Sequence, residues 1–165
     1  MINNHPDPNN TKSILSTLCY IKINGKTLMM KRNKRKNDVH FGKWNGLGGK
    51  LISGESIEEC IRREVKEESG LLINSLIFKG ILTFPSFIVD EDWYVFIFIA
   101  YEFEGTPFAE SHEGELHWIE DSKLLKLNLW DGDKIFIPWL DQPKFFSGKF
   151  EYQNGHLHNF DVVFY

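Results

Sequence analysis

Between residues 55 and 70 the chain places several acidic side chains at helical spacing. At about 100° per residue, Glu64 and Glu68 fall within the apolar stripe of a helix, and Glu67 falls at its edge. Carboxylates so close together repel one another, and partial burial adds to the cost of their charge. A divalent cation such as Mg2+, which prefers carboxylate and phosphate oxygens, would remove both costs. The pattern indicates a metal site; the alternative is a charged surface helix whose ends wrap around the core.

The same segment carries start and stop signals for a helix over residues 56–69. Ser56 is a suitable N-cap, Glu59 completes a capping box, and Gly70 is the usual left-handed C-terminal stop. The apolar stripe of this helix consists of Ile57, Cys60, Ile61 and Val65. We therefore expect the helix to pack this stripe on a core and to hold its inner carboxylates beside it.

A glycine-rich loop, residues 42–54, leads directly into this helix. Such loops often let backbone amides or carbonyls approach a ligand. A P-loop is excluded, because it would need glycine in place of Trp44 and Ser or Thr in place of Leu51. A dinucleotide-binding fingerprint starting at Gly46 is excluded too, because it would need glycine in place of Leu51. For the glycines alone, a tight turn before the helix is an equally simple explanation.

Composition limits the classes of function. The 165 residues are 42% hydrophobic and 25% charged, as expected for one globular domain, and the net charge is −4. This charge argues against a nucleic-acid polymer as the main partner, whereas a small anionic ligand could bind through a metal. Cys19 and Cys60 lie among apolar residues and are predicted to be reduced core residues, which suits the cytoplasm. Neither a signal peptide nor a membrane span is evident, since the apolar run 95–100 is too short.

The remaining patterns predict an α/β fold. Residues 1–12 resemble a flexible tail, and residues 13–165 are predicted to form a single domain. We expect strands at 15–23, 27–31, 76–84, 93–103 and 115–119, a helical turn at 122–127, a short helix at 133–140, and a final hairpin formed by 144–152 and 157–164. The nearly continuous apolar run 93–103 is predicted to be a central strand. Strands placed around two helices in so short a chain indicate a sheet between helical layers.

From Gly49 the chain reads Gly-x5-Glu-x7-Arg-Glu-Val-x-Glu-Glu-x-Gly-Leu, which resembles the Nudix box at every defined position. The resemblance implies the Nudix fold, an α/β/α sandwich around a mixed β-sheet. It also implies hydrolysis of a nucleoside diphosphate linked to another group, with Mg2+ as cofactor and Mn2+ as a possible substitute. The implied metal ligands in the box are Gly48, through its carbonyl, with Glu64, Glu67 and Glu68. Arg63 would orient the glutamates, and Glu67 is the favoured general base, with Glu64 and Glu113 as alternatives.

Beyond the box, three segments resemble the MutT-like 8-oxo-dGTP diphosphatases: Gly42–Lys50, Trp130–Asp133 and Lys144–Phe150. The positions thereby implied to bind substrate are Thr17, Lys31, Asn45, Leu47, Gly48, Gly49, Lys50, Trp130 and Asp133. Glu113 is implied as a further metal ligand. Two positions depart from some relatives, because Gly132 stands where a second Asp occurs and Val39 stands near a pocket phenylalanine.

Simpler roles exist for most of these residues. Asp133 could cap a short helix, Trp130 could be a core residue, and Asn45 could belong to a turn beside a glycine. Glu113 lies in an acidic stretch that would normally be a solvated loop, and the basic run 31–36 could be a solvated connection.

The sequence therefore predicts a Mg2+-dependent hydrolase that converts oxidised purine nucleoside triphosphates, such as 8-oxo-dGTP, to the monophosphate and pyrophosphate. Its partner would be this small molecule, with no nucleic-acid polymer and no membrane, and its oligomeric state stays open. One alternative is another Nudix substrate, either ADP-ribose, which Pro85 weakly suggests, or a dinucleoside polyphosphate. The other is a non-catalytic nucleotide sensor, which would usually have a broken Glu-x-x-Glu-Glu set; here the set is whole.

Overall fold

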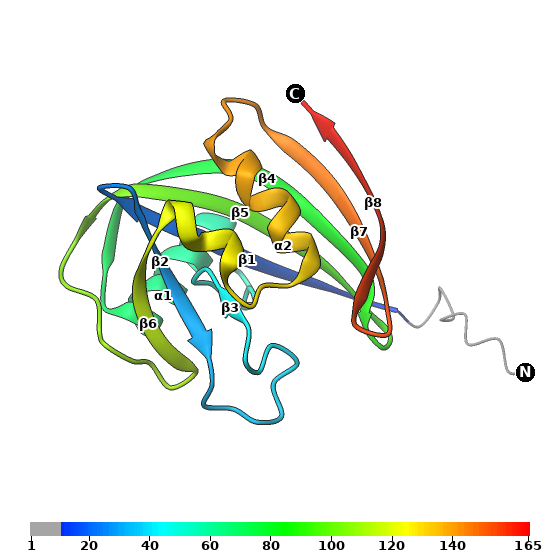
Figure 1. Ribbon diagram of the computed structural model, residues 1–165, viewed down its shortest axis with the longest axis horizontal. Helices are drawn as coiled ribbons and strands as arrows, with labels where there is room; N and C mark the ends of the chain where they lie inside the picture. Colours follow the sequence, from blue (N-terminus) through cyan, green and yellow to red (C-terminus); the bar gives the residue numbers. More distant parts are fainter. Residues whose placement is uncertain (1–10) are drawn as a thin grey trace, which may run out of the picture.

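The computed structural model describes residues 11–165, in which one mixed sheet is covered by helices on its two faces (Figure 1). The elements are β1 (Lys12–Ile23), β2 (Lys26–Arg32), β3 (Trp44–Asn45), α1 (Ile57–Ser69), β4 (Leu72–Ile88), β5 (Glu91–Glu104), β6 (Gly114–Glu120), the 3-10 helix η1 (Asp121–Lys126), α2 (Asp131–Phe136), the 3-10 helix η2 (Ile137–Asp141), β7 (Phe146–Gln153) and β8 (His156–Phe164). The strand order is β3-β2-β1-β5-β4-β7-β8, and β6 also pairs with β2. Only the β1–β5 and β4–β7 pairs are parallel among the named strands, so the sheet is mixed as predicted.

Two hairpins follow from local sequence. Asn24 and Gly25 join β1 to β2 with φ values of 50° and 70°, and Asn154 and Gly155 join β7 to β8 with φ values of 52° and 78°. Positive φ at both central residues is what tight hairpin turns require, and Asn-Gly tolerates it best. Both predicted hairpins are therefore confirmed.

The sheet separates two cores. On one face, Ile61 and Val65 of α1 pack on a buried cluster that includes Cys19 and Phe98. On the other face, Phe136 of α2 packs with residues of η1, η2 and the sheet. β5 lies between β1 and β4, and its segment Ile97–Ala100 is buried, which confirms the predicted central strand. Cys19 and Cys60 are free and buried, also as predicted.

The ends of α1 match the predicted caps. The side chain of Ser56 accepts a hydrogen bond from the Glu59 backbone at 3.2 Å, and the Glu59 carboxylate accepts one from the Ser56 backbone at 2.8 Å. Gly70 closes the helix at φ 78°, and its N–H donates to the Lys66 carbonyl at 2.9 Å. These short-range contacts fix where the acidic helix begins and ends.

Several boundaries differ from the prediction. β4 begins at Leu72, two residues after the helix stop Gly70. β3 was not predicted, because a strand of two residues is too short to show an alternating hydrophobic pattern. α2 begins at Asp131 rather than 133, so Asp133 lies inside the helix and does not cap it; from Ile137 the chain continues as η2, which contains Pro138. Of the predicted tail, residues 1–10 lie outside the described part, and Lys12 already belongs to β1. Within residues 11–165, no helix combines the length and apolar character that crossing a membrane requires.

Candidate active site

Arg63 gathers the carboxylates of α1 and of the preceding loop. Its Nε and Nη2 donate to the two oxygens of Glu55 at 2.6 and 3.0 Å. Its Nη1 lies 2.6 Å from Glu64 Oε1 and 3.4 Å from Glu67 Oε2, and its Nη2 lies 3.3 Å from the Lys50 carbonyl. A planar guanidinium held at several points is a rigid support for its neighbours. The predicted orienting role of Arg63 thus has a geometric basis, and Glu55 is the anchor that the predicted site did not include.

Glu68 is the buried member of the acidic set. Glu68 is only 2% exposed, and its Oε2 accepts a hydrogen bond from the Gly48 N–H at 2.9 Å. Burial raises the pKa of Glu68 well above its usual range; the Gly48 N–H opposes this, and the charges of Glu113 and Glu64 add to it. Glu68 is therefore a buried carboxylate in an acidic neighbourhood, and the positive charge of Arg32 only partly offsets the rise in its pKa.

Two glycines of the loop, Gly48 and Gly49, are surrounded by close contacts. A Cβ on Gly48 would lie 2.1 Å from the Thr17 carbonyl oxygen, and a Cβ on Gly49 would lie 2.5 Å from Cδ of Glu64. The loop runs along β1, where the Thr17 N–H donates to the Gly49 carbonyl at 2.9 Å and the Leu51 N–H donates to the Leu15 carbonyl at 3.0 Å. At Gly48 only glycine lets the backbone pass β1, whereas at Gly49 a side chain would displace the Glu64 carboxylate.

Glu113 approaches this group from the segment before β6. Its Oε2 forms an ion pair with Arg32, and its Oε1 lies 2.9 Å from Nη1 of Arg35. Its side chain is 16% exposed. Because the charge of Glu113 raises the pKa of Glu68, the two carboxylates lie within electrostatic reach of each other.

In residues 11–165, no group of three His, Cys, Asp or Glu side chains is already gathered as a metal cage. The donor set nevertheless fits a hard divalent cation, because Glu64, Glu68 and Glu113 offer only oxygen and Glu68 is buried within the field of the two other carboxylates. Glu67 is 55% exposed at its side chain, so it lies on the solvent side of the set.

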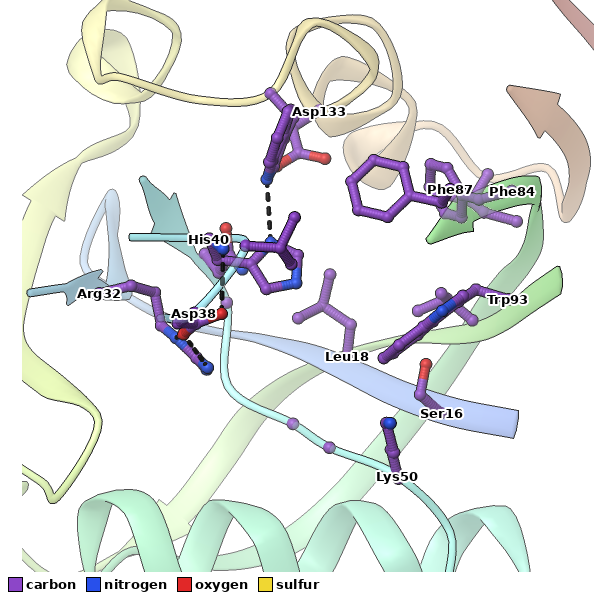
Figure 2. Close-up of a pocket in the computed structure, with 18 of the residues that line it drawn as sticks. Ser16, Leu18, Arg32, Asp38, His40, Lys50, Phe84, Phe87, Trp93 and Asp133 are labelled. Carbon is purple, nitrogen blue, oxygen red and sulfur yellow. Dashed lines mark hydrogen bonds and ion pairs between the residues drawn. The ribbon is translucent and has the colours of Figure 1, made fainter. Parts of the chain in front are cut away.

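A cleft of about 1010 Å3 opens beside these carboxylates. Figure 2 shows Asp133 and His40 at one end and Ser16 and Lys50 at the other, with Leu18 between them. Nine of the predicted site residues line it: Thr17, Asn45, Gly48, Gly49, Lys50, Glu64, Glu113, Trp130 and Asp133. This volume is at the upper end of the range for small-molecule sites.

The end of the cleft near α2 combines aromatic rings with unused polar groups. Trp130 packs edge-on to Phe87 at 5.2 Å and to Tyr152 at 5.9 Å between ring centroids. Oδ1 of Asn45 is buried and has no hydrogen-bond partner among residues 11–165. Burial raises the pKa of Asp133 to about 7, partly opposed by Lys43. A flat ligand with hydrogen-bonding edges would match this end.

Three predicted substrate contacts differ from the others in their surroundings. Leu47 is fully buried in the core under α1, and it does not line the cleft. Thr17 lines the cleft, but its hydroxyl lies 3.3 Å from Sγ of Cys60 and 3.4 Å from the Gly49 carbonyl. Lys31 does not line the cleft either; Arg32 does, because side chains alternate along β2.

The prediction also missed Asp38 and His40. Arg32 donates to Asp38 Oδ2 from Nε at 2.8 Å and from Nη2 at 2.5 Å, and Asp38 Oδ1 accepts the His40 N–H at 2.9 Å. His40 in turn accepts a hydrogen bond from Trp130 Nε1. The alternation of β2 could have indicated Arg32, whereas nothing in the spacing marks the loop residues.

At the opposite end, Lys50 extends over the ring of Trp93, with Nζ 4.7 Å from the ring centroid. Lys50 follows the two close-packed glycines and lines the cleft beside Ser16. Its ammonium group therefore adds positive charge next to the acidic set, where an anionic ligand would need it.

Comparisons with known proteins agree with this geometry. The family model described as NUDIX domain matches residues 13–140. Oxidized purine nucleoside triphosphate hydrolase of Danio rerio is 38% identical over 144 residues, which are 87% of this chain and 89% of the relative. The mouse protein of that name is 38% identical over 120 residues, 73% of this chain and 76% of the relative. The crystal structure of a MutT protein from Bacillus halodurans superposes with a TM-score of 0.79 at 31% identity, covering 90% of this chain and 97% of that one.

Proposed function

The chain belongs to the NUDIX family, and we propose that it hydrolyses oxidised purine nucleoside triphosphates, in particular 8-oxo-dGTP, to the monophosphate and pyrophosphate with Mg2+. Enzymes of this family generally use divalent metal ions and act on small nucleotides. Relatives named as hydrolases of oxidised purine nucleoside triphosphates support the choice of substrate.

The unpaired Oδ1 of Asn45 is the observation that carries the proposal. Oxidation at C8 of guanine adds a carbonyl oxygen and turns N7 from an acceptor into an N–H donor. A buried acceptor gains a partner from this N–H, whereas unmodified guanine leaves it facing another acceptor. Asp133, at the same end of the cleft, offers carboxylate oxygens to the N–H groups of the guanine amino edge. Sites built on paired polar groups reject bases that leave those groups unmatched.

The acidic set would supply the chemistry at the other end. Glu64, Glu68 and Glu113 would hold the metal together with the Gly48 carbonyl, and Glu67 at the rim is a fifth candidate ligand. When bound, Mg2+ neutralises phosphate oxygens and makes a water molecule easier to deprotonate. Lys50 would add a positive charge beside the phosphate chain.

One carboxylate must accept the proton of the attacking water, and we favour Glu67. Its side chain is 55% exposed, so water reaches it, and Arg63 holds it from 3.4 Å. Arg63 also holds Glu64, which lies against Gly49 and is thereby better placed as a ligand than as a mobile base. Because the monophosphate is no longer a polymerase substrate, the reaction would remove oxidised precursors from the nucleotide pool.

A substrate panel with Mg2+ tests the proposal. Purified protein is given 8-oxo-dGTP, dGTP, ADP-ribose and a dinucleoside polyphosphate, and the products are identified. We expect kcat/KM for 8-oxo-dGTP to exceed that for dGTP by at least roughly 10-fold, with pyrophosphate released. Comparable turnover of ADP-ribose, with no preference for 8-oxo-dGTP, would refute the proposed substrate.

A further inference from the structure

We propose that His40 is a specificity-determining residue of the cleft, whose Nε2–H donates a hydrogen bond to a carbonyl oxygen of the bound base. The inference rests on the proposed function in taking the ligand to be a purine nucleotide. His40 is otherwise a loop residue between β2 and β3, and its ring faces the cleft (Figure 2).

The hydrogen bond from Trp130 fixes which nitrogen of the ring carries the proton. Trp130 Nε1 lies 2.9 Å from His40 Nδ1. An indole N–H is a donor only, so Nδ1 must present its lone pair. In the neutral ring the proton is then on Nε2, and this nitrogen becomes a donor.

The surroundings of His40 keep the ring neutral. Burial lowers the pKa of His40 to about 4, and the nearby charge of Arg32 acts in the same direction. Asp38 and Glu113 oppose this effect but do not outweigh burial. Around neutral pH the ring therefore offers one donor and carries no charge.

Neighbouring groups also hold the ring in place. It stacks on Phe87 with a centroid distance of 6.1 Å and an interplanar angle of 18°, and it meets Trp130 edge-on at 6.0 Å and 85°. The His40 backbone N–H is bound by Asp38, which is itself held by Arg32. A donor fixed on three sides loses little entropy when a ligand binds, so its orientation can select among ligands.

Within residues 11–165, no group accepts a hydrogen bond from Nε2 of His40. A donor left open in a cleft favours a ligand that brings an acceptor to it. The base of 8-oxo-dGTP has two carbonyl oxygens, O6 and O8, whereas unmodified adenine has none. Asn45 and His40 thus form a complementary pair, an unpaired acceptor and an unpaired donor in one cleft.

Four monophosphates separate the possible acceptors: dAMP has neither carbonyl, dGMP has O6, 8-oxo-dAMP has O8, and 8-oxo-dGMP has both. Their dissociation constants are measured by calorimetry for the wild type and for two variants. His40→Phe keeps a ring on Phe87 without a donor, and His40→Gln keeps an N–H near the Nε2 position. His158→Phe, on an exposed position of the edge strand β8, is the matched control.

We expect His40→Phe to weaken binding by roughly 10-fold for the nucleotides that carry the accepting carbonyl, whether this is O6 or O8. The affinity for dAMP, which has neither carbonyl, should stay unchanged. His40→Gln should restore most of this loss, and His158→Phe should have no effect. A loss confined to nucleotides with O8, or to those with O6, supports the proposal and identifies the acceptor. An equal loss of affinity for all four nucleotides would mean that His40 only supports Trp130, and this result would overturn the inference. The inference would also be overturned if His40→Phe lost no affinity, or if the wild type bound none of the nucleotides. The proposed function is judged separately, by wild-type turnover of 8-oxo-dGTP.

Discussion

Glu55 and Arg63 form a two-point ion pair, with 2.6 Å between Glu55 Oε1 and Arg63 Nε and 3.0 Å between Glu55 Oε2 and Arg63 Nη2. The hydrogen bonds from Arg63 hold the pKa of Glu55 down, at about 2. The pair leaves Nη1 free to reach Glu64. Glu55 thus positions Arg63, and Arg63 positions the carboxylates of α1.

We predict that Glu55→Gln lowers kcat for 8-oxo-dGTP by roughly 10-fold, because the guanidinium loses its charged anchor while the carboxylates stay present. KM should change little, since Glu55 does not line the cleft. Glu58→Gln, an exposed position of the same helix, is the control and should retain wild-type kcat. An unchanged kcat in Glu55→Gln would show that Arg63 holds its position without this partner.

The two close-packed glycines should respond differently to alanine. At Gly49 the new methyl group would meet the Glu64 carboxylate, the end of a flexible side chain, so we expect a folded protein with activity reduced by roughly 100-fold. At Gly48 it would meet the backbone of Thr17, which cannot move without disturbing β1, so we expect a loss of about 1–3 kcal/mol in unfolding free energy. Urea denaturation and steady-state kinetics on both variants check this. Full activity of Gly49→Ala would contradict the placement of Glu64.

The raised pKa of Asp133, about 7, predicts a pH-dependent stability. The folded protein keeps the Asp133 proton up to about pH 7, whereas the unfolded chain loses it near pH 4. Ionisation of Asp133 therefore costs stability progressively between these values, and the full cost applies above pH 7. Asp133→Asn removes this cost, so its Tm relative to the wild type should rise from pH 5 to pH 8. A difference in Tm that does not vary with pH would contradict the assignment.

The same ionisation should affect binding of the base. The ionised carboxylate offers acceptors only, which suit two N–H groups of the guanine edge, whereas the protonated form offers a donor in place of one of them. The affinity for 8-oxo-dGMP should therefore increase from pH 6 to pH 8 in the wild type. In Asp133→Asn this increase should be absent, as titration calorimetry at each pH would show.

The acidic helix and the hairpins could be predicted from the sequence because their determinants are local. Ser56, Glu59 and Gly70 act within one or two turns of α1, and Asn-Gly specifies each tight turn by its own backbone preference. The approach of the glycine loop to α1 followed from the resemblance, since the contact of Gly49 with Glu64 joins two segments that no local pattern connects.

The rest of the cleft depends on long-range contacts. Trp130 and His40 are 90 residues apart and meet only because α2 and the loop before β3 come together. Lys31 was predicted to contact the substrate, whereas Arg32 lines the cleft, on the face of β2 shared with buried Met30. Asp133 lines the cleft, and its alternative role as a helix cap is wrong, because α2 begins two residues earlier.

Initial rates of pyrophosphate release from 8-oxo-dGTP, measured across a Mg2+ titration for the wild type and Glu67→Gln, test the central claim most directly. The account predicts no wild-type hydrolysis in EDTA, a rate that rises with Mg2+ to saturation, and a rate reduced roughly 100-fold or more in Glu67→Gln at saturating Mg2+. Hydrolysis that persists in EDTA, or that Glu67→Gln leaves unchanged, would contradict it.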